Sequence, residues 1–267
     1  MKLYLPLQKY DKFDKVVINF NQPMSLAMPY SIHKPQASAW YVDQVKFEPV
    51  IIDKWEGLVA KGASVNFRNI HFNPHGNGTH TECLGHITET IYDVYSNLKT
   101  YHSFAYLISV DLTTLDNGDQ IISKGAMQVA LKKIENTILP FSKNNPIKAL
   151  ILRTLPNSEE KLGKNYSHSN PPYMSDEAMF FLVRELGIEH FLIDLPSVDK
   201  EKDGGKLSAH HIFWQYPESP RYEATITELV YIDNNIRDGL YFLNLQIAPF
   251  ENDASPSNPC IYELLFE

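Results

Sequence analysis

The middle of the chain alternates between apolar runs of strand length and stretches in which apolar residues recur at helical spacing. Three runs have the length and composition of buried strands: HSFAYLISVDL (102–112), IKALILRT (147–154) and HFLIDLPSVD (190–199). The first run ends at Asp111 and is followed by the turn sequence DNGD. These runs predict three strands of one sheet.

Two stretches between these strands carry the helical pattern. SKGAMQVALKKIE (123–135) is one, and SDEAMFFLVRELG (175–187) is the other. The second starts at Ser175, a favourable N-cap residue, and Gly187 follows its last turn. One face of this helix should be apolar, with residues at i, i+3, i+4 and i+7: Met179, Leu182, Val183 and Leu186.

The order strand, helix, strand, helix, strand predicts parallel strands joined by right-handed crossovers. The last third adds two further strand-like runs, ATITELVYI (224–232) and LYFLNLQIAPF (240–250). We therefore expect one α/β domain over residues 1–267, with a mixed β-sheet flanked by helices.

Composition narrows the classes of partner. The 267 residues carry a formal net charge of −8, which argues against nucleic acid and against an anionic membrane surface as partners. The first 20 residues lack a signal-peptide pattern, and no apolar run is long enough to span a bilayer. The two cysteines, Cys83 and Cys260, do not form a disulfide framework. We expect a cytoplasmic protein.

The stretch NPHGNGTHTECLGH (73–86) holds three histidines and a glutamate. In an extended segment His80, Glu82 and His86 share one side of the chain. Imidazole and carboxylate form a ligand set that suits zinc, manganese or iron(II). His75 has the opposite parity, and a bulge at Gly76–Gly78 would turn it to the same side. The alternative is a surface loop whose histidines are unconnected.

A second cluster strengthens the metal interpretation. His210 opens the histidine pair in SAHHIFW, and Glu228 lies inside the apolar run ATITELVYI. A buried carboxylate needs a partner or a metal, whereas a strand-edge glutamate could simply face water. Cys83 has the wrong parity for the site and is interpreted as a packed side chain. The chain shows neither a G-x-S-x-G elbow nor a phosphate-binding glycine loop.

Several motifs together resemble one family. GNGTHTECLGH is similar to the H-x-G-T-H-x-D-x-P-x-H signature of the metal-dependent cyclase family, which includes bacterial kynurenine formamidase and isatin hydrolase. FLIDLPSVD, LSAHH, TITEL and NLQIAPFENDASP resemble further segments of that family, in the same order along the chain. Two departures stand out. Glu82 replaces an aspartate, and His75 precedes His80 by five residues instead of four.

The resemblance implies a role for each matched position. The implied metal ligands are His75, His80, Glu82, His210 and Glu228, with His71 as the alternative to His75. His86 is the implied proton donor and acceptor. The implied cofactor is a divalent metal, zinc or manganese, as one or two ions.

The resemblance also implies a reaction class. We expect a metal-dependent hydrolase of an amide or cyclic amide bond in a small-molecule substrate, similar to arylformamidase or isatin hydrolase. The alternatives are a lactonase or dehydrating cyclase with the same site, or a metal-binding or ligand-binding homologue without catalysis. The family implies a homo-oligomer, either a dimer or a tetramer.

Overall fold

The centre of the molecule is a β-sheet that closes into a ring. The computed structural model describes residues 16–31, 33–135 and 147–266. Seven strands form the ring in the order β16-β15-β8-β11-β13-β14-β7, and β7 pairs back onto β16. Their bounds are β7 His80–Glu82, β8 His102–Asp111, β11 Ala149–Leu155, β13 His190–Ile193, β14 Thr225–Glu228, β15 Gly239–Ile247 and β16 Ala254–Phe266.

Strand direction divides the ring into two parts. β8, β11, β13 and β14 are parallel to one another, whereas β7, β15 and β16 pair antiparallel with their neighbours. The predicted α/β class with a mixed sheet is confirmed. The closure of the sheet into a barrel was not predicted. The closing strand, β7, is only three residues long and gives no recognisable strand pattern in the sequence.

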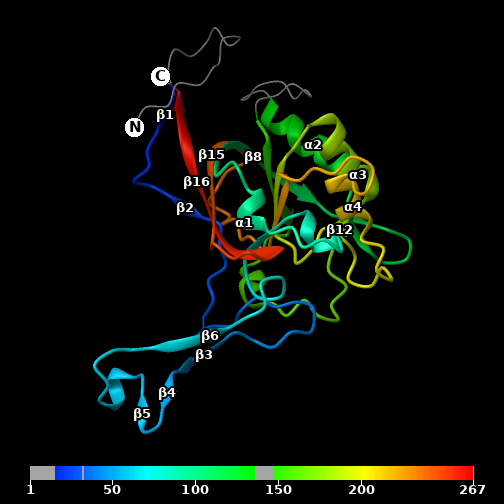
Figure 1. Ribbon diagram of the computed structural model, residues 1–267. Helices are drawn as coiled ribbons and strands as arrows, with labels where there is room; N and C mark the ends of the chain where they lie inside the picture. The colour runs from blue at the N-terminus through cyan, green and yellow to red at the C-terminus, as the bar shows by residue number, and fades with distance from the viewer. Residues whose placement is uncertain (1–15, 32, 136–146, 267) are drawn as a thin grey trace.

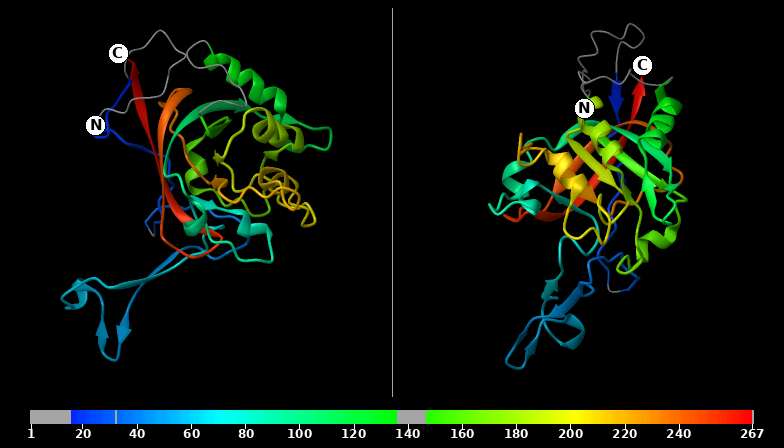
Figure 2. Two further views of the ribbon diagram at one scale, coloured as in Figure 1. Left: turned by 45° about the horizontal axis from the view of Figure 1, so that its top comes forward. Right: turned by 90° about the vertical axis from the view of Figure 1, so that its right-hand side faces the viewer.

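The two faces of the central strands have different partners. On β8, Tyr106 and Ile108 belong to the cluster that packs against the helices, whereas Ala105 and Leu107 belong to a second cluster on the opposite face, inside the ring. The helices lie together on one side of the barrel (Figures 1 and 2). They are α2 (Lys124–Glu135), α3 (Asp176–Phe180) and α4 (Ser208–Trp214).

The helix expected at 175–187 forms, with one difference. The Ser175 hydroxyl accepts a hydrogen bond from Ala178 N, as a cap should, and the four predicted apolar residues are buried. After α3 the chain continues as a π-helical turn, Phe181–Glu185, in which Leu186 N donates to Phe181 O five residues back. The wider turn keeps the apolar face against the barrel.

Short elements complete the body. They are β1 Val16–Ile18 and β2 Met24–Ser25, which pair with β16; a small sheet of β9 Thr113–Thr114, β10 Gln120–Ile122 and β12 Tyr173–Met174; and the helical turns η2 Leu84–Ile87, α1 Val94–Asn97 and η3 Glu159–Gly163. The N-terminal segment without a signal-peptide pattern lies largely outside the described residues. None of the helices in the described ranges has the length and apolar character needed to cross a bilayer.

A long excursion leaves the body between residues 46 and 71, and we call it the arm. It contains two ribbons, β3 (Lys46–Pro49) with β6 (Arg68–His71), and β4 (Ile51–Ile52) with β5 (Trp55–Glu56), followed by the turn η1 (Val59–Lys61). All views show the arm extending away from the barrel (Figures 1 and 2). The pattern of apolar runs did not predict this element.

Candidate metal centre

The site forms where the ring closes. β7 pairs with β14 on one side and with β16 on the other, so its three residues are held from both sides. His80 and Glu82 alternate along β7 and therefore share one face. Glu228 is directly opposite His80 in the register of β14. All three side chains are almost completely buried, with residue exposures of 0–3%.

His75 reaches the same site through a turn. The Asn73 side chain accepts a hydrogen bond from Gly76 N, and Gly78 has a φ of +70°, a conformation that favours glycine. The chain thus reverses before β7 instead of bulging within it. This turn brings His75 Nδ1 to 3.2 Å from Glu82 Oε2.

His71 does not approach this cluster. Its side chain lies on β6 of the arm, is 59% exposed and faces Glu48, with Nε2 3.6 Å from a Glu48 oxygen. The structure therefore favours His75 over His71 as the residue beside Glu82.

The second cluster, His210 and Glu228, comes from the C-terminal half of the chain. His210 is on α4, with Nε2 3.0 Å from Glu82 Oε1 and 3.9 Å from Glu228 Oε1. Glu228 Oε2 is 3.5 Å from His80 Nε2. Segments more than 120 residues apart in sequence thus converge on one carboxylate, Glu82.

Two groups of potential ligands share Glu82. His75, Glu82 and His86 form one group, and His80, Glu82 and Glu228 form the other; within each group the ligand atoms lie within 4.8 Å of one another. His86 Nε2 is 3.9 Å from Glu82 Oε2, and the side chain is 27% exposed. The structure thus brings together all six predicted site residues.

Two of the buried histidines are oriented by an oxygen on their far side. His210 Nδ1 lies 2.5 Å from Asp199 Oδ2, which leaves Nε2 directed at Glu82. His80 Nδ1 lies 3.1 Å from the Gly78 carbonyl, which leaves Nε2 directed at Glu228. Metal-binding histidines in proteins commonly have this outer partner, because it fixes the tautomer and the ring orientation.

Asp253 plays the same role for the other two histidines. Its Oδ2 atom lies 2.7 Å from His75 Nε2 and 3.3 Å from His86 Nδ1. The inner nitrogens of both rings are then left facing Glu82. The pKa of Asp253 is lowered because hydrogen bonds from the two histidines outweigh the effect of its burial.

The buried carboxylates and the histidines around them shift one another's pKa values. Burial, together with the nearby charge of Glu82, raises the pKa of Glu228. For Glu82, burial would raise the pKa, but the surrounding histidines, His86 and His210 foremost, lower it. With protein groups alone, the pKa of His75 is raised to about 10: burial opposes its charge, and Asp253 and Glu82 outweigh the burial.

Two atoms at the centre lack hydrogen bonds. Among the described residues, neither the buried Nε2 of His80 nor the buried Oε2 of Glu82 makes one. Unpaired buried groups of this kind are costly unless something binds them. A set of imidazoles and carboxylates that aims unsatisfied atoms at a common point fits a divalent cation.

Comparison with known proteins identifies the family of this chain. A family model described as Putative cyclase matches residues 18–200. This chain belongs to the cyclase family. The matched range includes the stretch from His75 to His86 and Asp199, and it ends before His210 and Glu228.

Solved structures share the fold of this cyclase-family chain. Isatin hydrolase A from Ralstonia solanacearum has a TM-score of 0.62 and 13% identity, with 91% of this chain and 92% of that chain covered. Isatin hydrolase A from Labrenzia aggregata, bound to benzyl benzoate, has a TM-score of 0.60 and 12% identity over 94% of each chain. A predicted metal-dependent hydrolase from Bacillus stearothermophilus has a TM-score of 0.58 and 14% identity, with 90% of this chain and 98% of that chain covered. No curated protein matches in sequence.

Sequence reasoning missed two residues of the cyclase-family site, Asp199 and Asp253. Both lie in segments that resemble the family, DLPSVD and ENDASP, but no role was assigned to either. A carboxylate distant in sequence from the histidines gives no periodic signal. Cys83 has its predicted place: it is fully buried, its thiol donates to the Tyr92 carbonyl, and burial raises its pKa to about 12.

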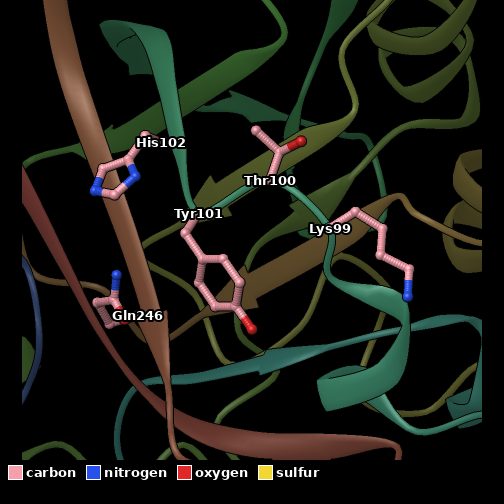
Figure 3. Close-up of a pocket in the computed structure, with 5 residues that line it drawn as sticks. All are labelled: Lys99, Thr100, Tyr101, His102 and Gln246. Carbon is pink, nitrogen blue, oxygen red and sulfur yellow. The ribbon is translucent and has the colours of Figure 1, made fainter.

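A surface pocket elsewhere does not have the character of a ligand site. It has a volume of about 450 Å³ and is lined by Lys99, Thr100, Tyr101, His102 and Gln246, at the start of β8 and the end of β15. Lys99 and His102 point in different directions (Figure 3), so the polar groups do not converge on a common point. None of the metal-centre residues lines it.

Proposed function

We propose that this cyclase-family chain is a metal-dependent hydrolase that opens an amide or cyclic amide bond in a small molecule. The observation that carries the proposal is the convergence of four histidines on two buried carboxylates, Glu82 and Glu228, with an outer oxygen partner for every histidine. A purely structural histidine cluster has no need of inner nitrogens that all face buried carboxylates. The solved structures named isatin hydrolase and metal-dependent hydrolase support the same reaction class.

The proposed ligands are His75, His80, Glu82, His210 and Glu228, and zinc or manganese suits this set. Glu82 has its Oε1 atom toward His210 and its Oε2 atom toward His75, so it would belong to both groups of potential ligands. A bound divalent cation supplies Lewis acidity toward a carbonyl oxygen and a nucleophile that is active near neutral pH.

His86 is the proposed proton donor to the leaving nitrogen. Its Nδ1 is held by Asp253, so Nε2 is the atom that faces the centre and can carry the proton. Unlike the fully buried His80, His86 is 27% exposed at the side chain, so it can exchange protons with solvent. The Asp253 carboxylate also keeps the ring in one orientation while the proton is taken up and given back.

The experiment starts with elemental analysis of protein purified without chelator. Turnover is then measured on a panel of N-formyl anilines, cyclic imides and lactones. On the active substrate, His86→Ala should keep its metal and lose about 10²–10⁴-fold in turnover, the usual contribution of a general acid–base group. His211→Ala is the matched control, because His211 neighbours His210 but hydrogen-bonds to the Tyr216 carbonyl.

Three results would count against the proposal. A wild-type protein that binds no transition metal after reconstitution removes its basis. Loss of metal in His86→Ala makes His86 a ligand. A metal-loaded protein that turns over no member of the panel favours a binding protein instead.

A further inference from the structure

A buried ion pair lies at the start of the segment that leads from β13 to the metal centre. Asp194 directly follows β13, is completely buried and forms a salt bridge with Lys161 of η3, with 2.7 Å between Nζ and Oδ2. β11 and β13 are parallel neighbours in which Leu152 is paired with Ile193, so Asp194 lies beside the end of β11. There its carboxylate accepts hydrogen bonds from the amide and the hydroxyl of Thr154.

The ammonium group of Lys161 is surrounded by oxygen atoms. Besides Asp194, its Nζ atom contacts the Thr154 carbonyl at 2.8 Å, the Thr154 hydroxyl at 3.0 Å and the Asn157 side-chain oxygen at 3.1 Å. The lysine side chain is only 12% exposed. Burial of an ammonium group and a carboxylate has a high desolvation cost, and an uncharged pair of similar size is often as stable. Stability alone therefore does not account for this pair.

The segment 194–199 makes two contacts with the metal centre. Val198 N donates a hydrogen bond to Glu228 Oε1 at 3.0 Å, and Asp199 Oδ2 lies 2.5 Å from His210 Nδ1. The whole segment is buried, so a shift at its first residue is passed on to its last. The ion pair fixes one end of the segment, and the other end orients two residues of the proposed ligand set.

We propose that Lys161 is a positioning residue of the metal centre: by holding Asp194, it fixes the segment that orients Glu228 and His210. The role assigned to Lys161 rests on the proposed function, because Glu228 and His210 are proposed ligands. Side chains that are already held in place bind an ion more tightly, since less freedom is lost on binding. Lys161 should therefore raise the affinity of the centre for its metal without touching the ion.

The test compares two variants of the ion pair. Lys161→Met leaves the Asp194 carboxylate buried without its cation, so both the stability and the metal affinity should fall. The double variant Lys161→Met, Asp194→Asn removes both charges and should regain most of the stability. Its affinity for Zn²⁺ should stay about 10–100-fold below that of the wild type, because the segment is no longer fixed. Denaturant unfolding of the metal-free proteins and competition with a chelator measure the two quantities.

A second buried ion pair on the same strand provides the matched control. Arg153 precedes Thr154 on β11, its side chain is 8% exposed, and its guanidinium lies 3.0 Å from Asp238 Oδ1. This pair holds the carbonyls of Asp233 and Ile236 and not the segment 194–199. Asp238→Asn should therefore lower the stability and leave the affinity for Zn²⁺ unchanged.

Amide hydrogen exchange of the metal-free protein gives a readout that needs neither metal nor substrate. In the double variant the Val198 amide should exchange at least about 10-fold faster than in the wild type, because the segment moves away from Glu228 more often. The Leu192 amide, inside β13, should keep its wild-type rate.

Two results would overturn the proposal. One is a double variant that regains wild-type affinity for Zn²⁺ together with its stability, since the pair would then be purely structural. The other is a double variant in which the Val198 amide exchanges at the wild-type rate. A wild type that binds no metal would refute the proposed hydrolase, and the exchange rate of Val198 would still decide whether Lys161 fixes the segment.

Discussion

The barrel and the arm use the same residue types in opposite ways. In the barrel, Ile151 and Leu192 on neighbouring parallel strands are fully buried, and every strand of the closed ring has two partners. In the arm, Ile51 and Ile52 also lie in a β-ribbon but are 68% and 57% exposed. An apolar strand is thus not by itself a core strand; what covers it decides its role.

The site follows the same division. Four of the five proposed ligands lie on β7, β14 and α4, where burial strengthens electrostatic interactions and tight packing fixes side chains. The arm carries His71 and Glu48, the same chemical pair, in water. The difference shows that a histidine beside a carboxylate forms a candidate site only where both side chains are buried and held in place.

The largest expected difference is between His80 and His71. His80→Ala should lose the bound metal and on the order of 10³-fold or more in turnover, because it removes a buried residue of the proposed ligand set. His71→Ala should leave both unchanged, because its ring points into solvent on the arm. Elemental analysis and turnover on the active substrate check both variants. Full metal content in His80→Ala would contradict the assignment, as would metal loss in His71→Ala.

Stability should separate the two regions next. Ile151→Ala should lower the free energy of unfolding by about 2–5 kcal/mol, because it leaves a cavity inside the ring. Ile52→Ala should change it by less than about 0.5 kcal/mol, because the Ile52 residue is 57% exposed. Urea denaturation of both variants provides the measurement. Equal losses would mean that the arm packs against its own barrel.

The core was predictable because its signal is local. Strand runs such as HSFAYLISVDL and the Ser175 cap depend on neighbouring residues, and the structure contains both. The closing strand β7 was not predictable as an element of the ring, since three residues carry no periodic pattern. The arm was missed for a related reason. Its apolar residues recur with neither the helical nor the strand period that indicates a buried face.

The site was predictable in part, through spacing and resemblance. Alternation placed His80 and Glu82 on one face, and Glu228 was predicted from its place in an apolar run and from the resemblance. The structure adds that Glu228 lies opposite His80 in the register of β14. The route of His75 required knowledge of a turn, which Gly76 and Gly78 indicated only by residue type. Asp253 and its two histidine contacts depend on tertiary structure alone.

A smaller effect compares two carboxylate–histidine pairs. Asp199→Asn should weaken metal affinity about 10–100-fold, because it loosens the orientation of His210. Glu48→Gln, beside His71 on the arm, should leave affinity unchanged. Competition with a chelator of known affinity measures both. An Asp199→Asn protein with wild-type affinity would show that the His210 ring is fixed by packing, for instance by its stacking on Trp214 at 5.5 Å.

The smallest effect is the response to acid. Burial lowers the pKa of His190 to about 4 in the folded state, against about 6.5 when unfolded. Between these values only the unfolded chain takes up the proton, so stability falls as the pH falls. His190→Gln should reduce this loss by about 1 kcal/mol between about pH 7 and 5.5. His71→Gln on the arm is the control. Denaturant titrations at both pH values check the prediction, and identical slopes for wild type and His190→Gln would contradict it.

Strand β7 connects folding to occupancy of the site. It is the strand that closes the ring, paired with β14 on one side and β16 on the other. Its first and last residues are both proposed ligands. If the pairing of β7 with β14 opens locally, His80 separates from Glu228. Opening of this strand and release of a bound ion are therefore thermodynamically coupled. By linkage, anything that binds the closed centre slows exchange of the backbone amide hydrogens of residues 80–82. Amide exchange at this short strand therefore reports occupancy before any substrate is known.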